Sequence, residues 1–206
     1  KTSLMPAGID TDFFRPMSEI EKNEKQILYL GRISPIKKIE YLIEAAKILD
    51  NNGLNFKVLM VGSPGSSAVD REYELKLKDM AVDLLSKGKV EFRSAISNHK
   101  THEVYNSSGI FVNLTPTGSF DKTILEAMSC GLPVLVSNKA LEHFFTQKLV
   151  EFCVFKENDT LDLVRKISNL LVLSDKNKLG EELRDIVITN HGLSRLTKEL
   201  ISHFLV

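Results

Sequence analysis

Two cations follow the first apolar run of the chain in an arrangement that suits an oxyanion. Arg32 stands directly after Gly31, and Lys37 lies further along the same loop. An arginine guanidinium presents a planar fork to oxyanions, whereas a lysine ammonium is a mobile point charge. Because the loop follows a strand-like run, we expect Arg32 and Lys37 to clamp a diphosphate. The alternative is that both are solvated surface cations.

The stretch 117–133 carries the signals of a helix with both ends marked. Its helix-forming residues 122–130 follow Asp121, which is a good N-cap. Gly131 suits the left-handed position after a helix, and Pro133 prevents continuation. Apolar runs on both sides predict a strand, a loop, this helix and a further strand.

The loop at the start of this helix is a second candidate for binding an anion. Backbone N–H groups at a helix N-terminus attract phosphate, and Gly118 permits close approach of the backbone. Asp121 leaves two possibilities open. Either its carboxylate caps the helix and phosphate is held elsewhere, or it turns outward and Lys122 offsets its charge.

Glu126 places a carboxylate inside an apolar helical run, between Leu125 and Ala127. An ionised carboxylate accepts hydrogen bonds, so Glu126 is chemically suited to hold two hydroxyls of a sugar or a ribose. The alternative is a carboxylate on the solvated face of the helix, and the local residues favour that alternative.

Other chemistry finds little support. His99 and His102 have a spacing that could share a metal, but no third ligand is evident, so we expect surface histidines and no metal. Cys130 and Cys153 predict two reduced core thiols rather than a disulfide. The Gly-x-Ser-x-Gly pattern of a serine hydrolase is absent, as is a phosphate-binding Gly-x-x-x-x-Gly-Lys loop.

The chain has no overall positive charge that would attract polyanions. Lys and Arg number 27 and Asp and Glu number 27, which argues against nucleic acid as a partner. No run is long and apolar enough for a transmembrane segment, so we expect a cytoplasmic protein. The chain begins at Lys1 rather than Met, which suggests a piece of a longer protein.

Strands and helices alternate along the chain. Expected strands cover residues 26–30, 56–61, 90–92, 109–114, 134–136 and 151–155. Expected helices cover 39–50, 70–85, a segment through 104–105, 122–130, 160–173, 175–189 and 194–204. This order predicts an α/β, Rossmann-like fold, a parallel sheet of about six strands with helices on both faces. Residues 1–23 form an arm or interdomain linker, and 24–206 form the domain.

Motifs in these positions resemble the C-terminal half of a retaining, group 1 glycosyltransferase with two Rossmann-like domains (GT-B). The segment 125–134 reads L-E-A-M-S-C-G-L-P-V, nearly the L-E-A-M-A-C-G-x-P-V of that family. The segment 31–37 resembles G-R-L-x-x-x-K, and 8–16 resembles the G-V-D-x-x-x-F-x-P entry to this domain. Residues 90–92 and 104–108 resemble V-x-F followed by L-Y-x-x-A-D. The order of the motifs covers nearly the whole chain.

The resemblance implies which residues bind the phosphates and the ribose of a nucleotide-sugar. Arg32 and Lys37 would bind the donor diphosphate, and Glu126 would hold the ribose hydroxyls. Groups at the start of the helix would also meet the phosphates, namely Phe120, Asp121, Lys122 and Thr123.

The resemblance also places the sugar and the base. Gly118 and Ser119 would contact the sugar, and Arg93, Ser94 and Ile96 would lie near the base. The nucleotide-sugar would be the substrate, with no cofactor and no metal required.

The sequence departs from the family pattern at three positions of the donor loops. Gly118 stands where the family has the first of two motif glutamates, of which Glu126 is the second. Asp121 and Lys38 each stand where many members have glycine. We expect these changes to alter donor preference or sugar contacts.

The resemblance implies the donor-binding half of an enzyme that moves a hexosyl group to an acceptor hydroxyl with retention. Arg32, Lys37 and the helix N-terminus would stabilise the leaving diphosphate. No catalytic base is assigned in this half. A sugar, glycan or lipid acceptor would bind through an N-terminal domain absent from this chain, so the isolated chain should be inactive. The full-length protein would be cytoplasmic or peripheral at the membrane.

Two other hypotheses about the function remain. A non-catalytic Rossmann-like binding or docking module would bind no nucleotide and would tolerate Arg32→Ala. A related enzyme with two Rossmann-like domains, such as a nucleotide-sugar epimerase, would need additional carboxylates and a histidine in the cleft.

Overall fold

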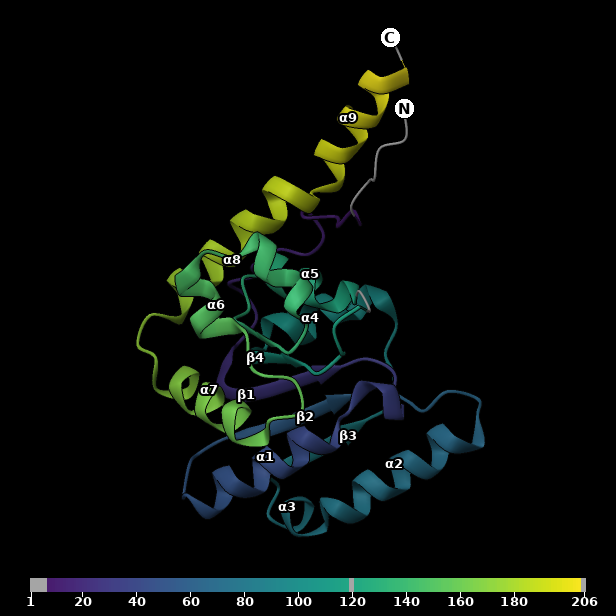
Figure 1. Cartoon of the computed structure of the whole chain (residues 1–206), viewed down its shortest axis with the longest axis vertical. Helices are drawn as coiled ribbons and strands as arrows, with labels where there is room; N and C mark the ends of the chain where they lie inside the picture. Colours follow the sequence, from purple (N-terminus) through teal and green to yellow (C-terminus); the bar gives the residue numbers. More distant parts are fainter. Residues whose placement is uncertain (1–6, 119–120, 205–206) are drawn as a thin grey trace.

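A computed structural model describes residues 7–118 and 121–204 of the chain. Its centre is a five-stranded parallel sheet with strand order β3-β2-β1-β4-β5 (Figure 1). The strands are β1 (Asn23–Leu30), β2 (Lys57–Val61), β3 (Val90–Arg93), β4 (Ser108–Asn113) and β5 (Val134–Val136). The predicted fold class, an α/β Rossmann-like fold with a parallel sheet and flanking helices, is confirmed.

Burial on both faces explains why the strands read as continuous apolar runs. Every residue of β4 is buried, and so are the last five of β1. Residues Ile27 and Leu28 of β1 pair in parallel with Val58 and Leu59 of β2. A strand covered on both faces gains from apolar side chains at every position, so the alternation typical of a half-exposed strand is absent.

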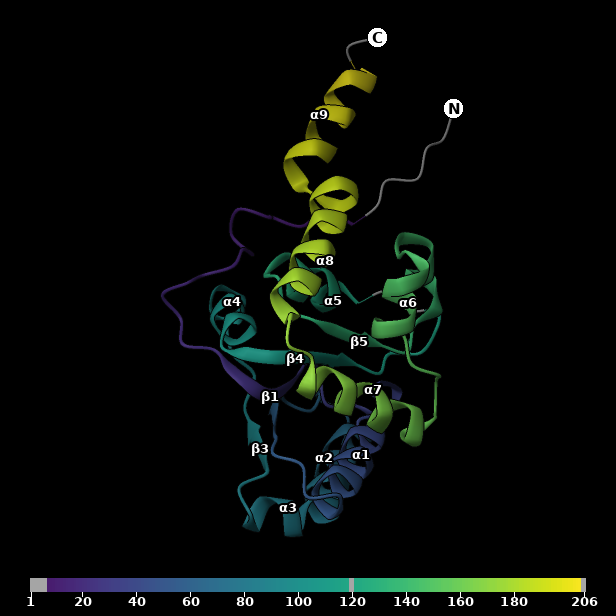
Figure 2. The ribbon, with the colours of Figure 1, turned by 90° about the vertical axis from the view of Figure 1, so that its left-hand side faces the viewer.

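Two layers of helices cover the sheet (Figure 2). One layer contains α4 (Asn98–Asn106), α5 (Lys122–Ser129) and α8 (Lys176–His191), with α5 packed against both of the others. The other contains α1 (Glu40–Asn51), α2 (Ala68–Met80) and α7 (Thr160–Val172), with α1 packed against α2 and α7. The remaining helical elements are η1 (Pro35–Lys37), α3 (Val82–Ser86), η2 (Lys139–Phe144), α6 (Gln147–Cys153) and α9 (Leu193–Phe204).

The sixth strand expected at residues 151–155 is wrong for most of its length. Residues Gln147–Cys153 form helix α6, whose start is capped by the Thr146 hydroxyl. The buried positions Leu149 and Cys153 are four residues apart, which is the spacing of one helical face. In the described part of the chain, this segment pairs with the sheet through one isolated parallel bridge, between Val154 and Val136.

The N-terminal arm is packed on the domain from residue 7 onward. Ile9 and Phe14 are buried, and Ile9 exchanges backbone hydrogen bonds with His191 and Leu193. The guanidinium of Arg184 donates to the carbonyl oxygens of Thr11, at 3.1 Å, and Phe14, at 2.9 Å. These hydrogen bonds attach the arm to helices α8 and α9.

Candidate functional site

A cavity of about 430 Å³ opens at the carboxyl ends of β1, β2 and β3. Ligands of open α/β sheets bind at this edge. Its wall contains Leu30, Gly31, Arg32, Val61, Gly62, Ser63, Pro64, Gly65, Ala95, Ile96, Asn98 and Thr101. The backbones of β1 and β2 approach closely there, since a Cβ at Gly62 would lie 1.9 Å from the carbonyl oxygen of Gly31. Only glycine fits at position 62 without a shift of the backbone.

Arg32 stands at this cavity with its charge available. Its carbonyl oxygen accepts a hydrogen bond of 2.7 Å from the buried Tyr29 hydroxyl, which fixes the backbone of the loop. The side chain is exposed, and within the described part of the chain its guanidinium makes no hydrogen bond or ion pair. Arg32 is therefore free to meet an oxyanion in the cavity.

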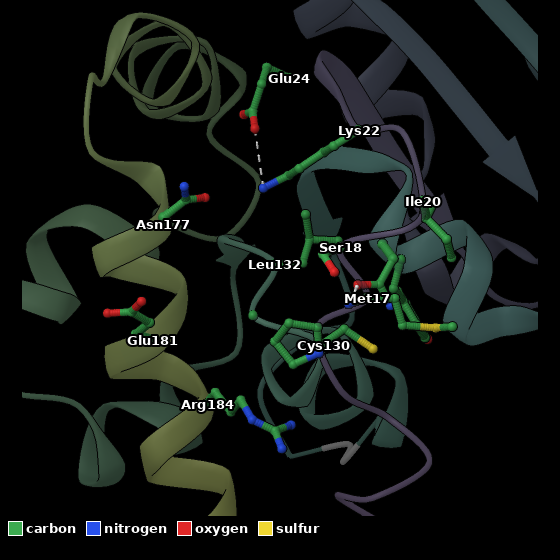
Figure 3. Close-up of a pocket in the computed structure, with 14 residues that line it drawn as sticks. Met17, Ser18, Ile20, Lys22, Glu24, Cys130, Leu132, Asn177, Glu181 and Arg184 are labelled. Carbon is green, nitrogen blue, oxygen red and sulfur yellow. Dashed lines mark hydrogen bonds and ion pairs between the residues drawn. The ribbon is translucent and has the colours of Figure 1, made fainter.

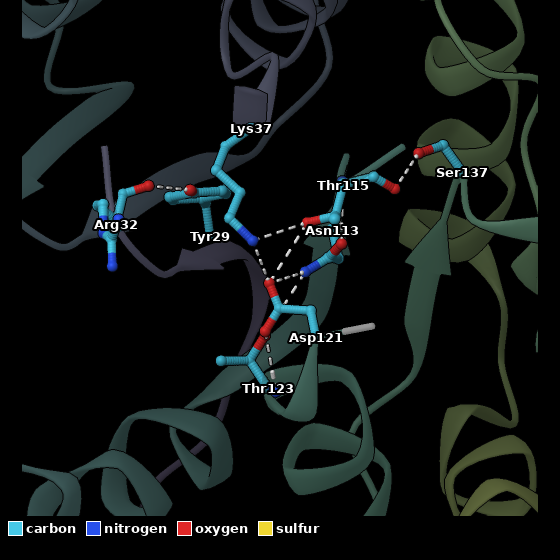
Figure 4. Close-up of polar contacts among 8 residues, drawn as sticks. All are labelled: Tyr29, Arg32, Lys37, Asn113, Thr115, Asp121, Thr123 and Ser137. Atoms are coloured by element: carbon cyan, nitrogen blue, oxygen red, sulfur yellow. Dashed lines mark hydrogen bonds and ion pairs between the residues drawn. The ribbon is translucent and has the colours of Figure 1, made fainter. Parts of the chain in front are cut away.

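Lys37 is not free in the same way. Its ammonium lies 2.7 Å from Oδ2 of Asp121 and 3.1 Å from the hydroxyl of Thr115 (Figure 4). The same Oδ2 accepts from Asn113 Nδ2 at 3.1 Å and from the Thr115 hydroxyl at 3.3 Å. The two predicted phosphate ligands Lys37 and Asp121 thus come together, but they bind each other.

The N-cap predicted at Asp121 is confirmed. Its Oδ1 accepts from the backbone N–H of Thr123 at 3.2 Å and from the Thr123 hydroxyl at 2.7 Å. Burial alone would raise the pKa of Asp121, but hydrogen bonds from Lys37 and Thr123 outweigh it and hold the pKa below its ordinary value. The carboxylate turns inward and caps α5, while Lys122 remains exposed. Of the two possibilities left open by the sequence, the structure selects the capping one.

Lys38 occupies a backbone conformation that glycine adopts more readily than residues with a side chain. Its φ is 49° and its ψ 39°, which is the left-handed region. Its ammonium lies 2.9 Å from Glu157 and 2.7 Å from the side-chain oxygen of Asn158. The ion pair holds together two loops at the carboxyl edge of the sheet.

Glu126 faces helix α4 rather than the cavity wall. Its Oε2 accepts a hydrogen bond of 2.9 Å from the hydroxyl of Tyr105, which is buried. Burial raises the pKa of Glu126, and the negative charge of Asp121 adds to the rise, while the Tyr105 hydrogen bond opposes it. Thr101, one helical turn before Tyr105, lines the cavity. Glu126 does not line this cavity, and Tyr105 holds one of its carboxylate oxygens.

The residues predicted near the base divide between the cavity and the surface. Ile96 lines the cavity, and the neighbouring Ala95 N–H donates to the Ser63 hydroxyl at 3.0 Å. The Arg93 side chain instead pairs with Glu91 at 2.5 Å. Ser94 is exposed and does not line the cavity.

Gly118 has a φ of +95°, which residues with a side chain rarely adopt. The space around it is open, since a Cβ there would meet no atom within 4 Å. The loop conformation, rather than crowding, thus favours glycine where the family motif has glutamate. The predicted positions Ser119 and Phe120 lie outside the described residues.

The sequence interpretation missed Asn113 and Thr115. Both are buried polar residues at the carboxyl end of β4, and both hydrogen-bond to Asp121. A polar residue that ends a fully buried apolar strand was the available signal, because such a side chain needs a hydrogen-bond partner.

A second cavity, of about 450 Å³, lies at the opposite, amino-terminal edge of the sheet (Figure 3). The arm forms one wall of it with Met17, Ser18 and Lys22, and α8 forms another with Asn177 and Glu181. None of the predicted phosphate or base ligands lines it. Of the predicted phosphate ligands, Arg32 lines the cavity at the carboxyl edge.

Neither cysteine lines the cavity that contains Arg32. Cys130 and Cys153 are buried free thiols, as predicted, and burial raises the pKa of each to about 12. No group of three or more His, Cys, Asp or Glu among residues 7–118 and 121–204 is arranged to hold a metal ion. No helix in the described part of the chain has both the length and the hydropathy needed to cross a bilayer.

Comparisons with known proteins agree on one family. A family model described as "Glycosyl transferases group 1" matches residues 10–186. A D-inositol 3-phosphate glycosyltransferase of Mycobacteroides abscessus is 28% identical over 145 residues, covering 66% of this chain and 31% of that protein. A lipopolysaccharide 1,2-N-acetylglucosaminetransferase of Salmonella typhimurium is 24% identical, covering 88% of this chain and 48% of that protein.

Solved structures show the same fold. Sucrose-phosphate synthase from Thermosynechococcus elongatus superposes with a TM-score of 0.82 at 22% identity, covering 99% of this chain and 52% of that one. HepE from Anabaena, solved with UDP and glucose, gives a TM-score of 0.80 at 16% identity, covering 98% and 56%. The chain spans about a third of the first curated relatives and about half of these two solved chains.

Proposed function

Since the chain belongs to the group 1 glycosyl transferases, we propose that it is the donor-binding half of a nucleotide-sugar-dependent glycosyltransferase. The full protein moves a hexosyl group to an acceptor hydroxyl with retention at the anomeric carbon. Relatives named as glycosyltransferases support the reaction class, and the UDP and UDP-glucose complexes of HepE support the ligand class.

The free guanidinium of Arg32 at the carboxyl edge of the sheet carries this proposal. Departure of the nucleoside diphosphate builds negative charge on the leaving oxygen. A preorganised cation next to that oxygen lowers the energy of the transition state. Arg32 is available at the cavity wall for this purpose, and Lys37 adds a second ammonium whose charge Asp121 offsets.

The nucleoside part of the donor has a suitable surface beside Arg32. Ile96 and Ala95 provide an apolar wall for the base. Glu126 accepts the ribose hydroxyls with the carboxylate oxygen that does not bind Tyr105. Tyr105 then acts as a positioning residue, because its hydroxyl orients the carboxylate.

The non-catalytic module is the second candidate, and two observations favour it. Lys37 is already paired with Asp121, and Gly118 offers no side chain to a donor sugar. A chain that had lost donor binding would show such internal pairing of its phosphate ligands. This candidate differs from the first in its response to nucleotides.

Calorimetric titration separates the two candidates. The chain is titrated with UDP, GDP and ADP and with their glucose or mannose conjugates. We expect binding of one nucleotide series, and Arg32→Ala should weaken it by about tenfold or more, because a hydrogen bond between charged groups contributes roughly 1.5–3 kcal/mol.

A matched arginine gives the control for this titration. Arg165 on α7 pairs with Asp162 and does not line the cavity, so Arg165→Ala should leave the affinity unchanged. Absence of binding to every nucleotide, or equal binding by wild type and Arg32→Ala, would support the docking module instead.

The isolated chain should bind the donor without sugar transfer. The acceptor, a sugar, glycan or lipid, binds through the part of the protein that lies outside this chain. Incubation with the bound nucleotide-sugar and simple acceptors should release nucleoside diphosphate no faster than the buffer control. Transfer at rates typical of enzymes would contradict this division of the protein.

A further inference from the structure

Hydrogen-bond donors around the start of α5 bind a carboxylate of the chain itself, that of Asp121. Asp121 accepts from Lys37 at 2.7 Å, from Asn113 at 3.1 Å and from Thr115 at 3.3 Å, all on Oδ2. Thr123 donates twice to Oδ1, through its backbone N–H and its hydroxyl. A lysine, an amide, hydroxyls and a helix N-terminus are the donors that proteins use for oxyanions.

The carboxylate is firmly held and remains charged. The side chains of Asp121 and Lys37 are 14% and 20% exposed, so water screens their pair only partly. The hydrogen bonds that lower the pKa of Asp121 keep it ionised at neutral pH. The charge of Lys37 is therefore offset, and Arg32 remains the unpaired cation at the cavity in the described part of the chain.

A phosphate that reaches Lys37 must come close to this carboxylate. A phosphate oxygen hydrogen-bonded to the ammonium lies about 3 Å from Nζ. Because Nζ is 2.7 Å from Asp121 Oδ2, that oxygen lies within roughly 6 Å of the carboxylate. At this separation, repulsion between the carboxylate and one unit of phosphate charge weakens binding by about threefold in water-like surroundings. At an effective dielectric constant near 20, the same repulsion weakens binding by about a hundredfold.

Donor and product differ in charge. The diphosphate of a nucleotide-sugar carries about two negative charges, whereas the free nucleoside diphosphate gains a further ionisation, with a pKa near 6, on its terminal phosphate. A fixed carboxylate next to the phosphates therefore repels the product more strongly than the donor.

We propose that Asp121 is a specificity-determining residue whose carboxylate, held against Lys37, disfavours the nucleoside diphosphate product relative to the nucleotide-sugar donor. This inference rests on the proposed function, since it assigns Asp121 a role in the same donor site. As a consequence, the nucleoside diphosphate product inhibits weakly, while binding of the nucleotide-sugar donor is retained.

The substitution Asp121→Asn tests the proposal with the helix cap retained. Asparagine caps helices about as well as aspartate, so α5 should keep its start. Calorimetry then compares UDP with UDP-glucose, GDP with GDP-mannose and ADP with ADP-glucose, for whichever pair the wild type binds. We expect the variant to bind the nucleoside diphosphate about tenfold more tightly and the nucleotide-sugar about threefold more tightly.

A second N-cap gives the matched control. Asp175 caps α8 through the Lys178 N–H and lies away from the cavity, so Asp175→Asn should change neither affinity. Equal tightening of both ligands by Asp121→Asn overturns the proposal, and so does weakening, which would mean that Asp121 positions Lys37. If the wild type binds no nucleotide at all, the proposed function itself fails, and that result is distinct from the other two.

Discussion

Gly180 of α8 lies against the end of α5, and replacing it by alanine reverses the usual effect of that substitution. A Cβ at position 180 would lie 2.0 Å from the carbonyl oxygen of Gly131 and 2.9 Å from its carbonyl carbon. In an unobstructed helix interior, Gly→Ala stabilises by about 1 kcal/mol. Here the overlap involves backbone, which cannot rotate away, so α8 must move relative to α5.

The magnitude follows from the opposing terms. Overpacking of this kind costs typically 1–3 kcal/mol and more where backbone must shift. After the gain in helix propensity, we expect Gly180→Ala to lower the free energy of unfolding by about 2 kcal/mol. For a domain of this size, each kcal/mol corresponds to roughly 2–4 °C, so Tm should fall by about 4–8 °C.

Thermal unfolding followed by circular dichroism measures this effect. Asn177→Ala on the same helix is the control, because its side chain is exposed and its change should stay within about 0.5 kcal/mol. An increase in Tm for Gly180→Ala, as in an ordinary exposed helix, would refute the close approach of α8 to α5.

Three further predictions concern side chains around the site. The variant Lys38→Gly should be more stable to unfolding than Lys38→Ala by about 1 kcal/mol. Both variants lose the ion pair to Glu157, but only alanine keeps the strain of the left-handed backbone conformation. Urea unfolding of the two variants measures the difference. Affinity for the nucleotide-sugar, which has no phosphate ionisation near neutral pH, should fall as pH decreases through the raised pKa of Glu126, because only the ionised carboxylate accepts two hydroxyls. Titrations of Glu126→Gln with the nucleotide-sugar at several pH values should lack that dependence. Tyr73→Phe should destabilise the chain by about 1–2 kcal/mol in urea, because its hydroxyl caps the start of α1 at the N–H of Ile39, 2.7 Å away.

Local patterns were sufficient to predict most of the fold. The cap at Asp121 and the apolar runs at β1 and β4 depend on neighbours in the sequence, and all three are present. The segment 151–155 was misjudged because its short apolar run, residues 152–155, suits a strand or a buried helix face equally. The burial of Leu149 and Cys153, four apart, shows the helical face that the run alone concealed.

The candidate site was less predictable because it depends on long-range contacts. Lys37 and Asp121 are 84 positions apart, and nothing local indicates that their charges pair. The orientation of Glu126 depends likewise on Tyr105, which a different helix supplies. The sequence could identify which residues meet at one edge of the sheet, but not which of them bind each other.

We expect a nucleotide to bind at the carboxyl edge of the sheet, beside Arg32. Mapping of backbone amide shifts by NMR during a titration with UDP, GDP or ADP tests it most directly. We expect the largest shifts at the cavity residues Arg32, Gly62 and Ile96, with little change at Asn177 in the cavity at the opposite edge. No shifts with any nucleotide, or shifts centred on Asn177, would contradict it.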